Sequence, residues 1–187
     1  WRYWLNGASG KIPVYLLDSD LAQNSKESRR LTDRLYDANK TTRLRQEIIL
    51  GRGGVKMLRA LGYKIYKYHL NEGHGSLATV ELLISSSYKQ EEKKLASVRQ
   101  QCVFTTHTPL PGAQDVFQKD FLLLHQADWP KQLNCLLEKG KLNMTKLGLY
   151  CCGRVNAVSK LHQAVSEKMF PNYPIDHVTN GVNSLFW

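Results

Sequence analysis

The stretch YKIYKYHLNEGHGSLATVELLI, residues 63–84, decides the fold class of this chain. Its first part, YKIYKYHL (63–70), is a β-branched and aromatic run that predicts a strand. NEGH (71–74) predicts a turn, and GSLATVELLI (75–84) has the apolar content and spacing of a helix. The stretch therefore predicts a strand, a loop and a helix in direct succession.

The same order of elements recurs along the rest of the chain. Four further strands are predicted, at IPVYLLD (12–18), CVFTTH (102–107), NAVS (156–159) and IDHVTNGV (175–182). Helices are predicted between them, at LTDRLY (31–36), TRLRQEIILG (42–51), VKMLRALG (55–62), KQEEKKLASVRQQ (89–101), NMTKLGLYCCGRV (143–155, with Asn143 as the N-cap) and KLHQAVSEKMF (160–170). This alternation indicates an α/β fold with a parallel sheet that helices cover on both faces.

GRGG (51–54) has two interpretations. A glycine-rich turn that opens a helix can cradle a phosphate group. Here the turn follows a helix-like segment and not a strand, so a bend between two helical segments is the favoured interpretation.

Polar residues follow the predicted strands at the points where the strands end. They are Asn71, Glu72 and His74 after the second strand, His107 and Thr108 after the third, Ser159 and Lys160 after the fourth, and Thr179, Asn180 and Gly181 after the fifth. Ligands of open α/β sheets bind outside the carboxyl ends of the strands. Donors and acceptors beside glycines, where backbone can approach closely, suit a polyhydroxylated ligand.

HLNEGH (69–74) offers a carboxylate and two histidines. A metal site is disfavoured, because the HExxH spacing is absent and Gly73 indicates a turn. Glu72 and His74 can instead hydrogen-bond each other or a sugar. Equally, this can be a helix cap beside a histidine whose hydrogen bonds are satisfied within the protein, and both interpretations stay open.

FTTHTPLPG (104–112) places His107 at a strand end, in a turn that two prolines stiffen. Since proline fixes φ, such a loop holds a side chain or a carbonyl in one place. The alternative is an ordinary loop histidine. No Ser/His/Asp order, nucleophile elbow, Walker motif or dinucleotide fingerprint is present.

Composition restricts the protein class. The 187 residues correspond to about one domain, and 42% apolar with 22% charged residues is typical of a globular protein. No apolar run approaches the ~18 residues of a membrane helix and no signal peptide is evident, so we expect a cytoplasmic protein without a membrane partner. The aromatic residues at both ends suggest a piece of a longer chain.

The net charge of +10 raises affinity for phosphates and nucleic acid in general. The basic residues are scattered and accompany no nucleic-acid-binding motif, so a solvated surface is favoured and no nucleic-acid partner is expected. The cysteines are Cys102, Cys135, Cys151 and Cys152. Their spacing suits no zinc site, and buried free thiols in a reducing compartment are expected.

A series of motifs in this chain resembles the α-glucan phosphorylase family of the glycogen and maltodextrin type. In chain order they are PVYLLDSD, NSKESRRLTDRLYD, RLRQEIILGRGG, LRALG, HLNEGH, FTTHTPLPGAQDVF, NMTKLGL, NAVSKLHQAVSEKMFP and HVTNGV. Each motif is short, but together they cover nearly the whole chain and are very specific.

The resemblance implies a GT-B fold, in which two Rossmann-like domains face each other across a cleft. Residues 1–187 would be a single incomplete domain, the later part of the N-terminal domain, without the C-terminal cofactor domain of the same chain. The implied reaction is phosphorolysis, in which orthophosphate releases terminal α-1,4-glucosyl units of a glucan as α-glucose 1-phosphate. The family's cofactor is pyridoxal phosphate, and the resemblance places the Schiff-base lysine outside this chain, so the isolated chain is expected to be inactive.

The resemblance also implies roles for individual residues. His107 matches an active-site histidine whose side chain and backbone carbonyl contact the glucosyl unit. Glu72 and His74 match positions that line the same cleft, and Asn180 and Gly181 match a turn near the boundary between the domains.

The chain departs from the family's common pattern at Gln114, Ala157 and Asn183. Two other functions stay open. One is a GT-B transferase that uses a nucleotide sugar, similar to glycogen or starch synthase. The other is a noncatalytic glucan-binding module.

Overall fold

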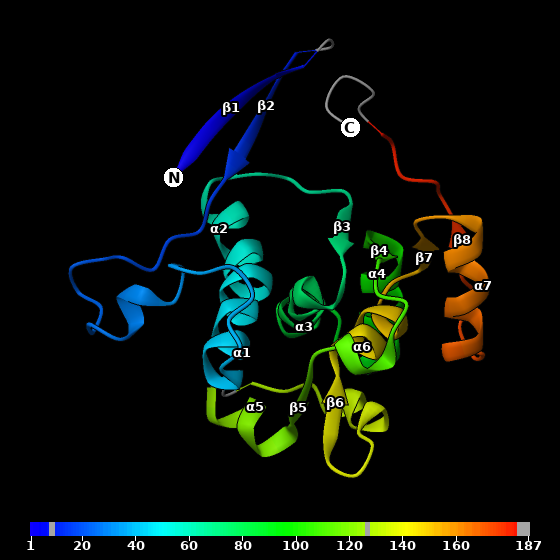
Figure 1. The fold of residues 1–187 in the computed structure, drawn as a ribbon. Helices are drawn as coiled ribbons and strands as arrows, with labels where there is room; N and C mark the ends of the chain where they lie inside the picture. The colour runs from blue at the N-terminus through cyan, green and yellow to red at the C-terminus, as the bar shows by residue number, and fades with distance from the viewer. Residues whose placement is uncertain (8–9, 126–127, 183–187) are drawn as a thin grey trace.

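A four-stranded parallel sheet organises the fold and lies on one side of the helical segment 40–60 (Figure 1). The computed structural model describes residues 1–7, 10–125 and 128–182, so Asn183 lies outside the described residues. The strands, in their order across the sheet, are β3 (Tyr68–Asn71), β4 (Cys102–Thr106), β7 (Arg154–Ala157) and β8 (Asp176–His177). All three pairings are parallel, which confirms the predicted α/β fold class with a Rossmann-like sheet.

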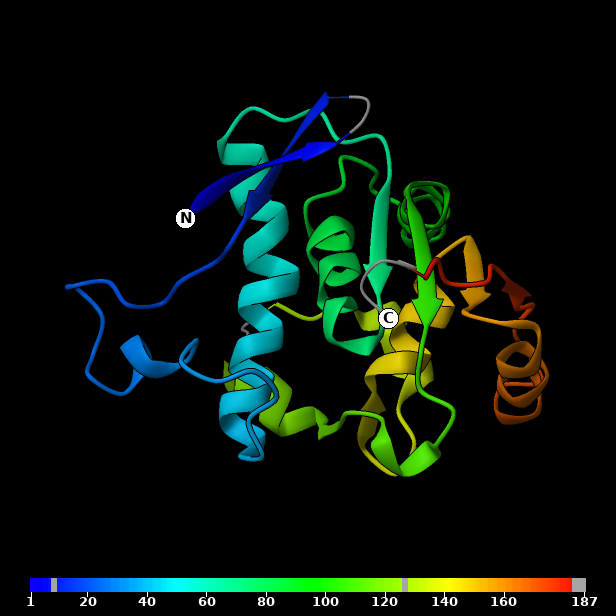
Figure 2. The same ribbon diagram turned by 45° about the horizontal axis from the view of Figure 1, so that its top comes forward.

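Helices form the connections between these strands. α3 (Leu77–Ile84) and α4 (Glu91–Gln101) join β3 to β4, α6 (Met144–Cys151) precedes β7, and α7 (Lys160–Met169) joins β7 to β8. Asn143 caps α6 by accepting a hydrogen bond from the Lys146 amide at 3.0 Å, as predicted. Figure 2 shows α3, α4 and α6 gathered beside β3 and β4.

The two faces of the sheet differ in polarity. The side chains that face the helices are buried and mostly apolar: Leu70, Phe104, Val155, Ala157 and Ile175, with the buried Thr106 among them. The opposite face carries mostly polar side chains: His69, Asn71, Thr105, Asn156 and Asp176, with Val103 among them. Within the described residues, the prediction of helices on both faces is therefore wrong.

The order of the strands explains this difference. The order β3, β4, β7, β8 advances in one direction without reversal. Because such crossover connections are nearly always right-handed, an advance in one direction puts every connecting helix on the same face. Covering the second face needs a reversal of strand order.

The predicted strand at 12–18 also behaves differently from expectation. β2 (Gly10–Tyr15) pairs antiparallel with β1 (Arg2–Gly7) in a separate two-stranded hairpin and does not join the parallel sheet. A short connection between neighbouring segments favours antiparallel pairing, whereas a parallel partner needs a long crossover. The segment 31–36, predicted as helical, forms turns after a 3₁₀ helix at Ser28–Arg30.

A long helical rod lies beside the sheet layer (Figure 1). It consists of α1 (Lys40–Ile48), a π-helical turn (Ile49–Gly53) and α2 (Gly54–Ala60). A Cβ atom on Gly51 would lie 2.7 Å from the Ala78 amide nitrogen, so glycine lets the wide turn contact α3 directly. GRGG is thus a distortion between two helical segments, which confirms the favoured interpretation.

Shorter elements complete the structure. β5 (Val116–Gln118) pairs antiparallel with β6 (Lys141–Asn143), and α5 (Lys119–His125) follows β5. Further 3₁₀ helices occupy Gly73–Gly75, Pro111–Ala113 and Lys131–Leu136. Cys102, Cys151 and Cys152 are buried free thiols as expected. Cys135 is exposed, because the 3₁₀ helix at Lys131–Leu136 buries Leu133 and Leu136 instead.

Candidate functional site

A polar cavity of about 410 Å³ opens beside the carboxyl ends of β3 and β4. Its lining residues are Tyr36, Arg43, Asn71, Glu72, Gly73, His74, His107, Thr108, Ala113, Gln114, Asp115 and Thr145. Parallel strands bring their carboxyl ends to one edge, and the loops that follow β3 and β4 therefore meet there. The structure brings together Glu72, His74 and His107, which are 35 residues apart at most.

Glu72 binds the two loops to each other. Its side chain is 7% exposed. One carboxylate oxygen accepts hydrogen bonds from the amides of His107 and Thr108, at 2.6 and 2.9 Å. The other accepts from the Gly73 amide at 3.1 Å, which caps the 3₁₀ helix. Glu72 therefore holds the backbone of His107 in place, and its oxygens are occupied by protein donors.

Two hydroxyl groups and an unusual backbone support the same carboxylate. The hydroxyls of Thr106 and Thr145 lie 3.5 and 3.4 Å from its oxygens. The backbone of Glu72 has φ 67° and ψ 177°, a combination that is sterically costly for any residue with a Cβ. The hydrogen bonds of the side chain offset that cost, so the loop geometry and the carboxylate depend on each other.

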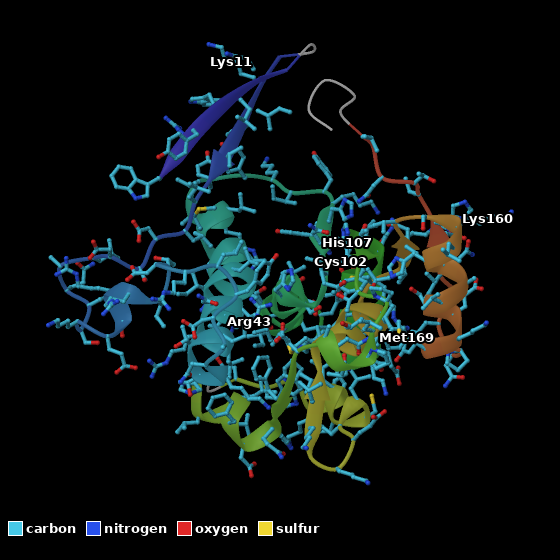
Figure 3. The ribbon with its side chains drawn as sticks, viewed as in Figure 1. Lys11, Arg43, Cys102, His107, Lys160 and Met169 are labelled. Atoms are coloured by element: carbon cyan, nitrogen blue, oxygen red, sulfur yellow. The ribbon has the colours of Figure 1, made fainter. Side chains whose placement is uncertain are left out.

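His107 lies at the mouth of the cavity. Its amide is bound by Glu72, while the residue itself is exposed. The loop after it continues into the 3₁₀ helix that begins at Pro111. Figure 3 labels His107 and Arg43, which both line the cavity and come from the loop after β4 and from α1. The loop is thus anchored at its beginning by Glu72 and stiffened further along by proline.

His74 pairs with Arg43. An Arg43 Nη2 atom lies 3.1 Å from His74 Nδ1 and also donates to Asp115 Oδ2 at 2.7 Å. The Tyr36 ring packs edge-on against His74, with ring centroids 5.6 Å apart, and Arg43 lies over the same tyrosine at 5.0 Å. Of the predicted alternatives, the structure shows Glu72 as a helix cap and His74 in contact with Arg43, while contact of either residue with a sugar stays a prediction.

The electrostatics around His74 favour its neutral form. Burial lowers the pKa of His74, and the positive charge of Arg43 lowers it further, while Glu72 and Asp115 act in the opposite direction. For Asp115, burial alone would raise the pKa, but the hydrogen bonds and positive charge of Arg43 lower it below its usual value. The cavity wall therefore carries a charged Asp115 and Arg43 beside a neutral imidazole.

Glu47 completes this cluster from α1. It is 1% exposed, and within the described residues neither of its oxygens accepts a hydrogen bond. Arg43 Nε is 3.3 Å away but donates to Asp115. Burial, followed by the charge of Asp115, raises the pKa of Glu47 to about 9. The protonated form of Glu47 is thus favoured at neutral pH, beside the charged Asp115.

Asn180 and Gly181 lie elsewhere on the same edge of the sheet. They follow β8, and β4 and β7 separate β8 from β3. The Asn180 amide donates to the Val158 carbonyl at 3.0 Å, and neither residue is among those lining the cavity. The structure does not place them with Glu72, His74 and His107.

Two of the departures from the resemblance lie in different environments. Gln114 lines the cavity and accepts a hydrogen bond from the Asn143 amide group at 2.6 Å. Ala157 is fully buried in β7 on the helix-covered face. The departure at Gln114 therefore lies in the cavity wall, whereas the departure at Ala157 lies in the core.

Sequence reasoning missed Tyr36, Arg43, Glu47 and Asp115. The spacing of Arg43 and Glu47 by four residues in a helix was a usable signal, because such pairs lie on one helix face. Asp115 is 72 residues from Arg43, and their pairing depends on how the chain folds.

In the described part of the chain, no three or more His, Cys, Asp or Glu side chains are grouped as metal ligands. Helices in that same part are too short or too polar to span a membrane.

Comparisons with known proteins match the chain to a starch synthase domain and to glucan phosphorylases. The sequence model of the starch synthase catalytic domain matches residues 3–173. The maltodextrin phosphorylase of Thermococcus litoralis is 37% identical over 197 aligned residues, which include 95% of this chain and 24% of that protein. Glycogen phosphorylases of Mycobacterium tuberculosis and Aquifex aeolicus are 33% and 36% identical, over 100% and 95% of this chain and 25% and 29% of theirs. The chain thus spans about a quarter of the length of these relatives.

Proposed function

This chain belongs to the α-glucan phosphorylase family of glucan-active glycosyltransferases, and we propose that it is part of an enzyme that phosphorolyses terminal α-1,4-glucosyl units of a glucan. In this reaction an orthophosphate oxygen forms a bond to the anomeric carbon of the terminal glucose. The glycosidic bond breaks, and the shortened glucan takes up a proton at the departing oxygen. The products are α-glucose 1-phosphate and a glucan one unit shorter.

The observation that carries this proposal is similarity to three named phosphorylases over 95–100% of the chain. The cavity supports the same ligand class. Donors and acceptors line it: imidazole, guanidinium and carboxylate groups with two amide side chains, those of Asn71 and Gln114. Sugar hydroxyls need both kinds of partner, so the lining suits a glucosyl unit better than an apolar ligand.

We assign His107 as the proposed catalytic residue of this part. The fold holds its backbone through the Glu72 carboxylate while the side chain stays accessible at the cavity. Such a fixed group can act on the glucosyl unit as positive charge develops at the anomeric carbon. Glu72 acts on the sugar through His107, and His74 lines the same wall. Asn180 and Gly181 remain proposed glucan contacts further along the sheet edge.

Pyridoxal phosphate does not fit the residues of this cavity. A Schiff base requires a lysine, and no lysine lines the cavity within the described residues. We propose that the cofactor and the orthophosphate site belong to the rest of the parent enzyme, with residues 1–187 in the N-terminal domain of a GT-B fold. The cytoplasm is the proposed compartment, because three of the four cysteines are buried free thiols.

The test is formation of glucose 1-phosphate from maltodextrin and orthophosphate. We expect activity from the parent enzyme and none from the 187-residue chain alone with added pyridoxal phosphate. Turnover by the isolated chain would contradict the assignment of the phosphate and cofactor sites. A parent enzyme that extends a glucan from a nucleotide sugar and ignores orthophosphate would establish the alternative, which the starch synthase match supports.

His107→Ala in the parent enzyme tests the residue assignment. Loss of a contact made in the transition state should lower kcat more than it raises KM, by ~3–4 kcal/mol in transition-state stabilisation. His125→Ala is the matched control, since His125 ends α5 and is not among the cavity residues. A raised KM with unchanged kcat would reduce His107 to a binding contact.

A further inference from the structure

The contact between Arg43 and His74 determines which ring nitrogen of His74 carries a proton. The Arg43 Nη2 atom lies 3.1 Å from Nδ1. A guanidinium group has only donors and stays charged in proteins. Nδ1 must therefore accept in this contact, which it can do only without a proton. In the neutral ring the proton is then on Nε2.

Arg43 is itself held firmly enough to impose this choice. Its side chain is 13% exposed, and Asp115 receives two hydrogen bonds from it, from Nε at 3.1 Å and from Nη2 at 2.7 Å. The Tyr36 ring lies against the guanidinium group. A guanidinium group bound through two nitrogens and stacked on a ring has little freedom to turn away.

We infer that Arg43 is a positioning residue that holds His74 as the Nε2-protonated tautomer, so that the ring donates a hydrogen bond to an oxygen of the bound glucan. The identification of the ligand as a glucan rests on the proposed function, whereas the tautomer does not. A neutral N–H donor matches an uncharged hydroxyl oxygen. Arg43 thus acts on the sugar through His74.

The charges around the ring agree with a neutral His74. The charged and titratable groups that face it come from every element packed around it: Arg43 on α1, Tyr36 before α1, Glu72 after β3, His107 after β4 and Asp115 after the Pro111–Ala113 helix. Burial and the positive charge of Arg43 lower the pKa of His74, although the carboxylates of Glu72 and Asp115 act to raise it. Removing Arg43 should therefore raise it.

Nitrogen-15 NMR of the histidine rings in the full chain reads the tautomer directly. We expect the wild-type His74 ring to carry its proton on Nε2 at neutral pH. Arg43→Met removes both the donor and the charge, so a mixture of tautomers and a higher pKa of His74 should follow. Arg43→Gln keeps an N–H donor without the charge, so the pKa should rise with less change in tautomer.

Arg45→Met is the matched control for these variants. Arg45 is on the same helix but pairs with Glu27 at 2.9 Å, and it is not among the cavity residues. Its substitution should leave the His74 spectrum unchanged. A proton on Nδ1 in the wild-type chain would overturn the inference even if no Arg43 variant folds. An unchanged tautomer in a folded Arg43→Met variant would overturn it as well.

Titration with maltoheptaose tests the donor role separately. We expect the Nε2 proton signal of His74 to shift on binding, and Arg43→Met to weaken binding by up to about tenfold, the size of one neutral hydrogen bond. Binding without any change at His74 would overturn the donor role. No binding by the wild-type chain would instead contradict the proposed function, and the tautomer measurement would still decide the role of Arg43.

Discussion

Two buried glutamates, Glu72 in the cavity wall and Glu47 outside it, differ in what surrounds their oxygens. Glu72, after β3, accepts hydrogen bonds from three backbone amides. Glu47, on α1, meets another carboxylate, and the one nearby cation donates to that neighbour instead. Burial and Asp115 raise the pKa of Glu47 to about 9. A buried carboxyl group with several hydrogen-bond donors can hold the surrounding backbone in place, whereas one without donors is favoured in its protonated form.

The comparison also separates two kinds of support for the site. On the strand side, a carboxylate organises backbone, so the position of His107 depends on it. On the helix side, a guanidinium group pairs with side chains, so the state of His74 depends on it. Substitutions should therefore affect the strand side through stability and the helix side through pH dependence.

The largest expected effect is that of Glu72→Ala. It leaves three amides near a buried site without their acceptor and removes the compensation for a strained backbone. We expect a loss of about 3–5 kcal/mol in the free energy of unfolding, which is typical when one partner of a buried, charged hydrogen-bond network is removed. Urea denaturation measures it.

Glu72→Gln is the companion variant. It keeps the shape and one acceptor oxygen, so its loss should be smaller than that of Glu72→Ala. If Glu72→Ala lowered stability by less than about 1 kcal/mol, other contacts would have to hold the two loops, and the contrast with Glu47 would disappear.

Glu47→Gln should change the pH dependence of stability. Between pH 4.5 and about 9, native Glu47 keeps a proton that the unfolded chain releases. The native state then binds more protons, so wild-type stability falls as pH rises, with a slope of up to about 1.4 kcal/mol per pH unit from this group. Glutamine cannot ionise, so the variant should lack this slope and be the more stable protein at the alkaline end.

Denaturation curves at several pH values between these limits measure the slope. Glu27→Gln is the control, because Glu27 is an exposed partner of Arg45 and should leave the slope unchanged. Equal slopes for wild type and Glu47→Gln would show that Glu47 is ionised in the folded protein, as a carboxyl with adequate donors would be.

Thr145→Val should have the smallest effect. Its hydroxyl is 3.4 Å from Glu72 Oε1, a long hydrogen bond beside three shorter ones from amides. We expect a loss of about 0.5–1 kcal/mol in the free energy of unfolding, and Thr145→Ser should retain most of the stability. A loss comparable to that of Glu72→Ala would mean that the hydroxyl, and not the amides, maintains the carboxylate.

Local patterns predicted most of the secondary structure. β4 and the helices α3, α4, α6 and α7 lie where strand-like and helix-like patterns predicted them. β3 begins only at Tyr68, later than the predicted start at residue 63. β7 begins at Arg154, within the predicted helix, and ends at Ala157, before the predicted end at residue 159. β8 is shorter than predicted, because only Asp176–His177 pair with β7. The first predicted strand exists, but its partner is a neighbouring segment and not the sheet. Pairing partners are a property of chain topology, which a strand's own composition does not contain.

The site likewise has features that the sequence predicted and features that depend on the tertiary structure. The sequence by itself determined that Glu72, His74 and His107 would follow strands and meet at one sheet edge, because parallel strands direct their carboxyl ends together. Only the tertiary structure brought Arg43 to His74, across 31 residues of separation, and to Asp115, across 72 residues. Charge state depends on burial and on neighbours in space. These exist only once distant segments pack, which is why the protonated Glu47, the neutral His74 and the uncovered sheet face could not be derived from residue order alone.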